Sequence, residues 1–594
     1  MARRTPQKRT SRASGARAGG PRPRFRHPLK FLFIVGGVMS GVGKGVASAS
    51  LAMLLEARGV RVTALKIDPY INVDAGTMNP TEHGEVFVLS DGMETDQDMG
   101  NYERFLNRDL SRANYMTTGS VYLSVIEKER NLAFGGRNVE VVPDIPLEVI
   151  ARIRRAAELD NAQVAVVEIG GTVGEYQNIL FLEAIRMLKI EQPDDVGVVL
   201  VSYLPVPSTV GEMKTKPTQY AARALNSAGV FADLILARAP QPLDAKRREK
   251  IARSCNVPPQ RVISAPDVSN IYEVPLNFER EHITQELCSV LGLQRECALQ
   301  ANLQQWQSMV RKARRARREV RIAVVGKYFH SGEFVLSDVY LSVLEAIKFS
   351  AWRQGLRPVL EYISSVPFEQ GTVVRMLDKF DGIVVPGGFG ARGIDGTLQA
   401  ISYARTRGIP YLGLCYGMQL MVVEFARNVA GLKGAHTTEI DPNTPHPVVT
   451  ILPEQAALVK QNRYGGTMRL GEYPALLKPG TIAAEAYFGA RAAQRGGGGN
   501  GLLISERHRH RYEVNPEYVP ALEAAGLVFS GTSPDGRLME IAELPRERHP
   551  FMVGTQFHPE FHARPLAPHP LFSAFIRASA ARCASRGESD SGGK

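Results

Sequence analysis

Apolar residues in the first half of the chain are grouped into short runs that alternate with amphipathic segments. The strongest runs are at 31–35, 60–67, 164–168, 196–203 and 233–237. Runs of this length, separated by helical segments and glycine-rich turns, are typical of strands buried on both faces of a parallel sheet. The pattern therefore predicts an α/β domain that opens with a strand, a glycine-rich turn and a helix through Ala57.

The same alternation starts again at Arg321. Expected strands at 321–326, 382–388 and 411–415 alternate with expected helices at about 338–354 and 396–407. Together the two patterns predict two doubly wound, mostly parallel α/β domains, because 594 residues is too long for one ordinary core. The predicted division is a leader at 1–29, a first domain at 30–292, a helical linker at 293–319, a second domain at 320–577 and a polar tail at 578–594.

The net charge of +12 is concentrated at the start of the chain. Residues 1–30 contain ten Lys or Arg and no acid, so the remainder is close to neutral. A leader rich in Arg, Pro, Ser and Gly cannot bury enough apolar surface to fold, and we expect it to be disordered, with weak binding to nucleic acid or acidic surfaces as the alternative. We interpret the basic run 311–318 as a surface helix and expect no specific nucleic-acid partner.

The first residues also imitate a secretory signal, because an apolar run from Leu29 to Met39 follows the basic leader. Glycines and Lys44 interrupt that pattern, and no stretch of the sequence is apolar for long enough to span a bilayer. The five cysteines are widely spaced, with no CxxC pair, which indicates neither a disulfide framework nor a zinc site. We therefore predict a cytoplasmic protein without a membrane partner.

A glycine-rich run at 36–45 lies between the first expected strand and helix, where backbone N–H groups and a helix N-terminus can hold phosphate oxygens. Lys44 adds a full positive charge there. The strict P-loop motif fails, because Val38 and Gly45 stand where it requires Gly and Ser or Thr. The run predicts a phosphate loop, with a plain structural turn as the alternative, and another group must replace the hydroxyl that normally binds magnesium.

Acidic residues are the candidates for that group. Asp96 and Asp98 lie in the segment GMETDQD, and Glu168 ends an expected strand before a Gly-Gly-Thr turn. Mg²⁺ needs few carboxylates where phosphates and water fill its other positions. The segment KTKPT at 214–218 offers two further lysines and hydroxyls suited to a triphosphate, although each of these features also occurs in ordinary solvated loops.

A candidate nucleophile, Cys415, follows an expected strand in GLCYGMQ, and His558 and Glu560 follow in QFHPE. A strand, a sharp turn and a helix N-terminus expose and activate a thiol. Within one strand His558 and Glu560 would project to the same face, so the imidazole would take the thiol proton while the carboxylate orients the ring. Backbone N–H groups near Gly388 and Tyr416 would form the oxyanion hole. A buried cysteine is usually only a small apolar residue, but these features together predict a Cys-His-Glu triad.

Eight long motifs are the most specific signals in the chain. They are KIDPYINVDAGTMNPTEHGEVFV (66–88), EIGGTVGE (168–175), GEMKTKPTQ (211–219), PGGFGARG (386–393), GLCYGMQ (413–419), EFARNV (424–429), ERHRHRYEVN (506–515) and QFHPEFHARP (556–565). With these motifs, residues 31–576 resemble the CTP synthase family, and the second half resembles class I glutamine amidotransferases. The resemblance implies a P-loop-like synthetase domain followed by a glutaminase domain.

The resemblance also implies roles for single residues. For ATP it implies Ser40, Gly41, Val42, Gly43, Lys44, Gly45, Val46, Lys66, Asp98, Asp267 and Val268. For UTP, and for inhibitory CTP in an overlapping site, it implies Ser40, Glu175, Tyr176, Gln177, Lys214, Thr215, Lys216, Pro217, Thr218, Gln219 and Lys250. For glutamine it implies Gly388, Tyr416, Gly417, Met418, Gln419, Glu439 and Arg511. Asp98 and Glu168 match magnesium ligands, and Cys415, His558 and Glu560 match the triad.

The reaction implied by the resemblance joins an amine to a nucleotide. ATP would phosphorylate O4 of UTP, and Cys415 would release ammonia from L-glutamine. Ammonia would then pass through an internal passage and displace phosphate at C4 to give CTP. A homotetramer, GTP as an allosteric activator and CTP as a feedback inhibitor are implied by the resemblance alone.

A few positions depart from the family's pattern. Glu175-Tyr176-Gln177 stands where Asp-Ile-Glu is usual, in a segment that contacts the cytosine side of the CTP site. Tyr416, Pro266 and Tyr220 stand where Leu, a basic residue and His are usual. None of these changes removes a predicted catalytic group. Two alternatives stay open: another P-loop amidotransferase, such as a cofactor amidase, and an inactive regulatory or filament-forming homologue.

Overall fold

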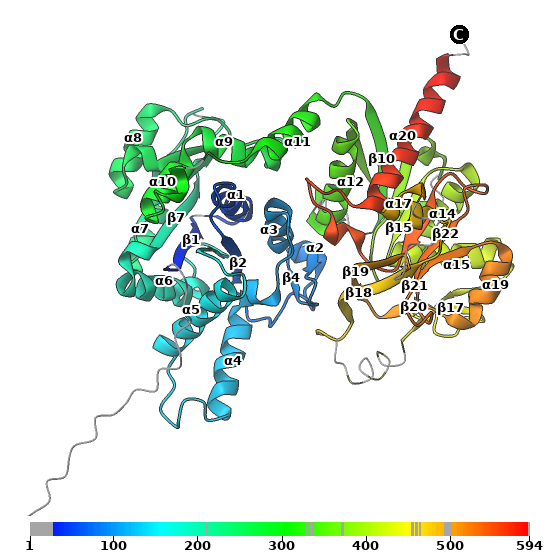
Figure 1. Cartoon of the computed structure of the whole chain (residues 1–594), viewed down its shortest axis with the longest axis horizontal. Coiled ribbons are helices and arrows are strands. Elements are labelled where there is room, and N and C mark those ends of the chain that lie inside the picture. Colours follow the sequence, from blue (N-terminus) through cyan, green and yellow to red (C-terminus); the bar gives the residue numbers. More distant parts are fainter. Residues whose placement is uncertain are drawn as a thin grey trace, which may run out of the picture.

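The computed structural model has two α/β halves that lie side by side, and helix α11 (Gln304–Arg315) leads from one to the other (Figure 1). The structure describes residues 28–594 except 38, 210, 299, 328–329, 332–333, 336–337, 370–373, 453–454, 456, 458–460, 462–464, 492–500 and 592–594. The predicted disordered leader, apart from its last two residues, and a flexible loop tip predicted at the glycine run 496–499 therefore lie outside the described residues.

The first half is built on a seven-stranded sheet in which neighbouring strands are parallel, in the order β5-β2-β6-β1-β7-β8-β9. Its strands are β1 (Lys30–Gly36), β2 (Val62–Asp68), β5 (Tyr115–Thr117), β6 (Val164–Ile169), β7 (Val196–Tyr203), β8 (Leu234–Ala239) and β9 (Val262–Pro266). Its longer helices are α1 (Lys44–Glu56), α3 (Asp98–Leu106), α4 (Thr118–Arg130), α5 (Val141–Leu159), α6 (Ile179–Glu191), α7 (Lys216–Ser227), α8 (Ala245–Cys255) and α10 (Ile283–Val290). Shorter elements are α2 (Pro80–His83), β3 (Val86–Val88), β4 (Glu94–Asp96) and α9 (Val274–Arg280).

Strand β1 shows why the apolar runs are continuous. Leu32 and Ile34 join the core on the side of α1, whereas Phe31, Phe33 and Val35 join a second core on the side of α5 and α6. Successive side chains of a strand point to opposite faces, so a strand covered by helices on both sides needs apolar residues at every position.

The second half contains a nine-stranded mixed sheet in the order β13-β10-β14-β15-β23-β22-β21-β18-β19. The first five of these strands are parallel, and pairing becomes antiparallel from β23 onward. Its strands are β10 (Glu319–Gly326), β13 (Arg357–Ser364), β14 (Gly382–Val385), β15 (Tyr411–Leu414), β18 (Arg469–Leu477), β19 (Leu503–His510), β21 (Val528–Thr532), β22 (Met539–Leu544) and β23 (Met552–Thr555). Its helices include α12 (Leu341–Arg353), α14 (Ile394–Arg407), α15 (Tyr416–Asn428), α17 (Ile482–Phe488), α19 (Val519–Ala525) and α20 (Pro570–Ser591). A small sheet adds β16 (His436–Thr437), β17 (Pro447–Ile451) and β20 (Tyr512–Val514). The predicted fold class is confirmed.

One feature near the end of each half differs from what the sequence analysis predicts. Helix α20 runs through the predicted boundary at residue 578 and buries Ser579, so the polar composition beyond that residue does not end the fold. Cys288 is disulfide-bonded, so the prediction of no disulfide was wrong there; spacing along the chain contains little information about which cysteines meet in space.

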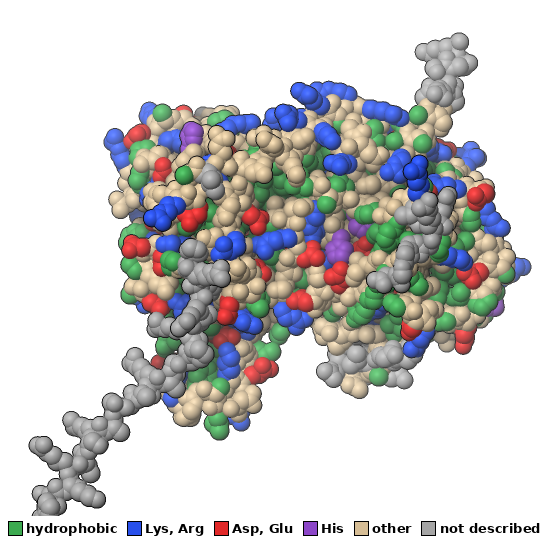
Figure 2. Space-filling view, viewed as in Figure 1, with side chains coloured by type: hydrophobic (Ala, Val, Ile, Leu, Met, Phe, Trp, Pro, Cys, Tyr) green, Lys and Arg blue, Asp and Glu red, His purple; other side chains and the backbone are tan. Residues whose placement is uncertain are grey.

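Charge is mixed on the face shown in Figure 2, where basic and acidic side chains are interspersed and Lys and Arg gather along the upper edge. Within the described residues, no helix is long and apolar enough to cross a membrane.

The two halves share a core and a buried ion-pair network. One continuous apolar cluster includes Phe87 of the first half and Phe561 of the second, whose ring centroids are 5.0 Å apart. Beside it, Glu103 of α3 accepts hydrogen bonds from Arg507 at 2.9 Å and from Arg564 at 2.5 Å, and all three side chains are buried. The network therefore fixes the position of one half against the other.

Replacing Glu103 with glutamine should lower the free energy of unfolding by about 3 kcal/mol, because it removes the buried carboxylate of two buried guanidinium groups and leaves them only the half-exposed Asp109. Chemical denaturation would measure the change. Glu158→Gln is the matched control, since Glu158 only pairs with Arg155 on an exposed helix surface, and its effect should stay within about 0.5 kcal/mol. Equal small effects of the two substitutions would contradict the structural role of the network.

Candidate active sites

The predicted phosphate loop joins β1 to α1. Gly41 and Gly43 have φ angles of +71° and +80°, which side chains rarely adopt, and this backbone brings Lys44 to the first turn of α1. The Lys44 side chain is buried, and its Nζ donates a hydrogen bond to the carbonyl of Gly171 at 2.7 Å. The loop therefore combines a helix N-terminus with a cation held at a fixed position.

Gly45 explains the departure from the strict P-loop motif. A Cβ atom at this position would lie 2.0 Å from Oδ1 of Asp98, so the carboxylate occupies the space of the usual Ser or Thr side chain. Asp98 is the first residue of α3, and its backbone N–H donates to Asp96 at 2.9 Å. A carboxylate thus stands where a hydroxyl would normally bind a metal ion.

Lys66 of β2 gathers the acidic residues around this loop. Its Nζ pairs with Asp98, lies 3.2 Å from Oε1 of Glu168 and 3.6 Å from Oδ1 of Asp68. The hydroxyl of Tyr102, on α3, donates to the other oxygen of Glu168. Asp98 and Glu168, predicted as a pair from distant motifs, therefore meet at one buried point.

Burial and charge oppose each other in this cluster. Burial alone would lower the pKa of Lys66, but Asp68, Asp98 and Glu168 outweigh it and raise that pKa well above its ordinary value. Burial raises the pKa of Glu168, whereas Lys66 outweighs burial at Asp98 and lowers the pKa of that carboxyl. Burial lowers the pKa of Lys44. The cluster is an acidic pocket that favours positive charge at its centre.

A pocket opens beside the phosphate loop, between β7, β8, β9 and α9. Gly43 and Val46 line one side, and Pro266 and Val268 line the other. Arg238 of β8 also lines it, donates to the carbonyl of Val42 at 3.1 Å and pairs with Asp267. The predicted nucleotide residues Val46, Asp267 and Val268 are therefore brought together next to the phosphate loop.

The two segments predicted for the second nucleotide also reach the loop. Glu175 accepts from the backbone of Thr172 at 3.0 Å and from Gln177 at 2.6 Å, and it packs against Gly171, which binds Lys44. Tyr176 between them is 91% exposed.

The segment 214–219 leads into α7, where Thr218 bonds to Ser202 of β7 at 2.9 Å and Ala221 lies against Gly37. Lys214 pairs with Glu212 at 2.8 Å. Lys250, exposed on α8, is one of the cations that lower the pKa of the Glu212 carboxyl, after Lys214 and Arg247. The predicted lysines 214 and 250 therefore lie on the same side of the fold.

The cysteine of the second half sits at a sharp turn. Cys415 ends the step from β15 to α15 with φ 49° and ψ −97°, a conformation that L-residues rarely adopt. Gly417 makes the turn possible, because a Cβ atom there would lie 2.2 Å from the carbonyl of Val385. Cys415 is 5% exposed and is held at a helix N-terminus, as a nucleophile requires.

His558 and Glu560 meet, but not in the predicted way. His558 Nδ1 lies 2.7 Å from Oε1 of Glu560, although strand β23 ends at Thr555 and Pro559 begins a 3-10 turn. The expectation of one shared strand was wrong, because proline has no N–H for a strand ladder. Nε2 of His558 is buried, and Gly387 packs against the ring.

The charge of His558 is coupled to its neighbours. Burial alone would lower its pKa, but Glu560 and Cys415 outweigh burial and raise the pKa to about 10. The arrangement therefore favours an imidazolium ring beside the Cys415 sulfur.

A cradle of backbone and polar side chains faces the turn. Glu439 accepts from the backbone of Gly390 at 2.8 Å, and the hydroxyl of Tyr416 donates to the carbonyl of Gly390 at 3.3 Å. Lys327, which the sequence analysis missed, lies over the ring of Tyr416 at 4.7 Å, and burial lowers its pKa to about 8.

Three other residues predicted for glutamine have different environments. Arg511, between β19 and β20, donates to Gln455 at 2.8 Å and to Thr467 at 3.0 Å. Gln419 is buried and donates to the carbonyl of Tyr512 at 2.9 Å. Met418 packs against β23 in the core, so only its backbone is available to a ligand.

Residues that no motif singled out contribute to both sites. Tyr102 and Arg238 are examples in the first half and Lys327 is one in the second, and each contacts a group that is distant in the sequence. A strand pattern identifies such positions as buried, but it does not say which carboxylate they meet. The sequence marked these residues only as polar positions within apolar elements.

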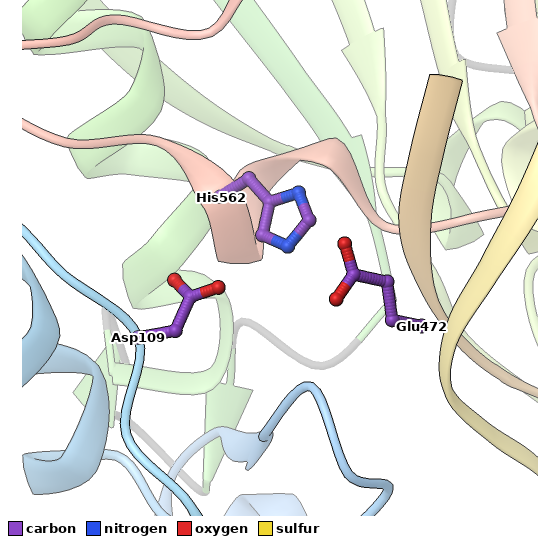
Figure 3. Close-up of side chains that lie close together, drawn as sticks. All are labelled: Asp109, Glu472 and His562. Carbon is purple, nitrogen blue, oxygen red and sulfur yellow. The ribbon is translucent and has the colours of Figure 1, made fainter. Parts of the chain in front are cut away.

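A third group of titratable side chains lies between the halves (Figure 3). Asp109, Glu472 and His562 each bring one atom within 4.8 Å of the others. Asp109 is already paired with Arg564 at 2.8 Å and with Arg507 at 3.0 Å. Two guanidinium groups at one carboxylate disfavour a further cation, so we interpret this group as part of the interdomain ion-pair network.

Replacing Glu560 with glutamine should lower the rate of glutamine hydrolysis by about 10²- to 10⁴-fold, because the imidazole loses the carboxylate that orients and charges it. The measurement is glutamate release under saturating glutamine.

Stability supplies a second test. The raised pKa of His558 stabilises the fold below the ordinary value near 6.5, and this contribution is lost as pH rises through about 10. The wild type's advantage over the variant should therefore shrink through that range, and an advantage independent of pH would contradict the assignment.

Comparisons with known proteins match both halves. A family model described as "CTP synthase N-terminus" matches residues 30–293, and one described as "Glutamine amidotransferase class-I" matches residues 335–578. The CTP synthase of Thermococcus gammatolerans is 50% identical over 93% of this chain and 99% of its own length. A CTP synthase of Thermus thermophilus is 46% identical over 96% of this chain and 99% of its own length. A solved glutaminase domain of Trypanosoma brucei CTPS with bound acivicin is 34% identical, covers 44% of this chain and 94% of its own, and has a TM-score of 0.38.

Proposed function

We propose a function for each site from one premise, which is that this chain belongs to the CTP synthase family. The chain is a glutamine-hydrolysing ligase that makes CTP from UTP with ATP as co-substrate, and it has a synthetase and a glutaminase domain. The observation that best supports the residue assignments is the pair of separate sites: a phosphate loop beside a cation-favouring acidic cluster in one half, and a cysteine turn in the other.

In the synthetase half, the backbone of residues 40–46 and the ammonium groups of Lys44 and Lys66 would bind the triphosphates. The adenine ring would enter the pocket lined by Val46 and Val268, with Arg238 at its rim. UTP would lie across the Glu175–Gln177 and Lys214–Gln219 segments, with Lys250 nearby. Phosphate would be transferred from ATP to O4 of UTP between these two groups of residues.

The carboxylates fit magnesium. Asp98 and Glu168 both contact one ammonium nitrogen, so their oxygens converge on a point that already favours a cation. Two carboxylates plus phosphate oxygens and water form the kind of oxygen set that Mg²⁺ takes. When bound there, Mg²⁺ would neutralise charge on the transferred phosphate. Asp98 would also replace the missing Ser or Thr of the strict motif, which is why Gly45 must lack a side chain.

In the glutaminase half, the Cys415 thiol would transfer its proton to His558, and the thiolate would attack the side-chain amide carbon of glutamine. The backbone N–H groups of Gly388 and Tyr416 would stabilise the oxyanion. Protonated His558 would donate to the leaving ammonia and then accept a proton from the water that hydrolyses the thioester. Glu439 and Arg511 would bind the charged end of glutamine.

Several further properties rest mainly on the family. We propose that the enzyme is a cytoplasmic homotetramer that GTP activates and CTP inhibits. Exposed apolar side chains on the first half, such as Tyr176 and Ile179, support burial of this surface in an assembly. The departure at 175–177 lies on this surface. Because the resemblance implies that this segment contacts the cytosine side of the CTP site, the departure would alter those contacts.

A coupled assay tests the proposal directly. The protein with UTP, ATP, Mg²⁺ and glutamine should give CTP, ADP, phosphate and glutamate in equal amounts. Alternative acceptors in competition with UTP distinguish this activity from that of another amidotransferase, and loss of glutamine turnover in the presence of UTP and ATP would favour an inactive homologue.

A further inference from the structure

Gln556 lies directly behind the candidate nucleophile. It follows the last residue of β23, it is fully buried, and its backbone N–H donates to the carbonyl of Glu540 at 2.8 Å. Its side chain reaches Cys415, with Nε2 located 3.7 Å from Sγ. A hydrogen bond to sulfur is longer than one to oxygen, so this distance is a normal contact for an amide donor and a sulfur acceptor.

The orientation of the amide group is fixed by a second contact. Oε1 of Gln556 accepts a hydrogen bond from Nε2 of Gln419 at 3.3 Å. Nε2 of Gln419 also donates to the backbone carbonyl of Tyr512 at 2.9 Å, so that nitrogen is the donor. The oxygen of Gln556 must therefore face Gln419, and its N–H groups must face the sulfur.

The bonds of Sγ change when its proton leaves. The thiol donates to the carbonyl of Arg509 at 3.9 Å, but a thiolate has no proton to donate and only accepts. The Gln556 N–H then faces a full negative charge, and such charge-assisted hydrogen bonds are about twice as strong as neutral ones. The bond is therefore stronger after proton transfer than before it, which is the property that promotes a reaction step.

We propose that Gln556 is a further catalytic residue, whose amide N–H stabilises the Cys415 thiolate and aims Sγ at the glutamine amide. The inference rests on the proposed roles of Cys415 and His558. The proton moves from Sγ to Nε2 of His558, and Gln556 forms no covalent bond and exchanges no proton. Gln419, a predicted glutamine contact, holds the amide in this orientation, so the same chain of amides links the substrate pocket to the sulfur.

Other titratable groups around the sulfur have defined states. His558 faces Sγ from the 3-10 turn, with Glu560 behind it. His508 and His510 lie on β19, and burial lowers the pKa of both well below the ordinary value, so they stay neutral. Among these described neighbours, Gln556 supplies a neutral donor whose effect on the thiolate does not depend on pH.

The test uses the full-length enzyme and diazo-oxo-norleucine, a glutamine analogue that alkylates a catalytic thiolate. Gln556→Glu keeps the size of the side chain and an oxygen for Gln419, but it removes the donor to sulfur and places a carboxylate there. We expect the rate of labelling near neutral pH to fall about 10- to 100-fold, and the rise of the rate with pH to shift to higher pH. Gln556→Met, which removes the donor without adding charge, should shift the profile in the same direction by less.

Thr555→Val is the matched control. Thr555 precedes Gln556 and is equally buried, and its hydroxyl donates to the carbonyl of Phe557 at 2.9 Å. Its loss should slow no step through the sulfur and should leave the pH profile in place. Ammonia-dependent CTP synthesis, measured for every variant, reports whether the chain remains folded.

The outcomes separate two failures. If peptide mass spectrometry finds no label on Cys415 in the wild type, the proposed glutaminase site is wrong. If the wild type is labelled on Cys415 but Gln556→Glu and Gln556→Met keep its pH profile, only the role of Gln556 is overturned. A shift of equal size in Thr555→Val would also overturn it, because the effect would then be structural.

Discussion

Replacing Cys415 with alanine should abolish CTP synthesis from glutamine, with a fall of at least about 10⁴-fold, and should leave synthesis from free ammonia within a factor of about three. The reason is the separation of the two sites. Cys415 lies at the turn between β15 and α15 in the second half, whereas Lys44, Asp98 and Glu168 lie in the first half. On the proposed assignment, no ammonia is released from glutamine without the thiol, but the groups proposed to activate UTP are untouched.

The measurement is CTP formation with saturating glutamine and, separately, with saturating ammonium salt at a pH where free ammonia is present. Cys583→Ala is the matched control, because Cys583 is a partly buried free cysteine on α20 whose thiol contacts the carbonyl of Glu319 on β10 at 3.8 Å, outside the triad. It should retain both activities. If Cys415→Ala loses ammonia-dependent synthesis while remaining folded, the assignment of one reaction to each half is wrong.

Replacing Lys44 with methionine should have the opposite pattern. Synthesis from glutamine and from ammonia should both fall by about 10²- to 10³-fold, because each requires the cation that we propose to contact the triphosphate. Methionine fills a similar volume but lacks the ammonium group that now binds the carbonyl of Gly171. Initial rates of CTP formation at saturating ATP and UTP would measure the loss.

Labelling of Cys415 by a glutamine analogue should persist in Lys44→Met, which would show that the second half stays intact.

Ser48→Ala is the control for a substitution in the same helix, α1. Ser48 lies one turn further along α1, and its buried hydroxyl has no hydrogen-bond partner among the described residues, so its removal should leave both activities near the wild-type level. Normal synthesis by Lys44→Met would exclude this lysine from the phosphate site.

The fold could be predicted from the sequence where local rules decide it. Apolar runs located β1, β6, β7 and β15, because a strand buried on both faces must be apolar throughout. The glycine-rich turn before Lys44 followed from the same logic, since positive φ angles need glycine. His558 and Glu560 were expected to meet and they do, although their expected shared strand was wrong, because residues so close in sequence can also meet across a turn.

Contacts that depend on distant partners could not be predicted in this way. Gly45 looked like a defect in a phosphate loop until Asp98, from another helix, was found to fill its space. Glu103 and Arg507 are separated by some four hundred residues, and nothing in the pattern around either one indicates the other. Pairings of this kind are set by how whole elements pack, so they become visible only in the fold.

The shared core and ion pairs between the halves limit how such an enzyme can change over time. Its two halves have separate chemistries, and a gene fusion could in principle exchange one glutaminase for another. A replacement that lacked Arg507 and Arg564 would leave Glu103 charged and buried, and one without Phe561 would expose Phe87. An incoming domain would therefore have to bring a matching face as well as a working cysteine, so the two halves must be inherited together.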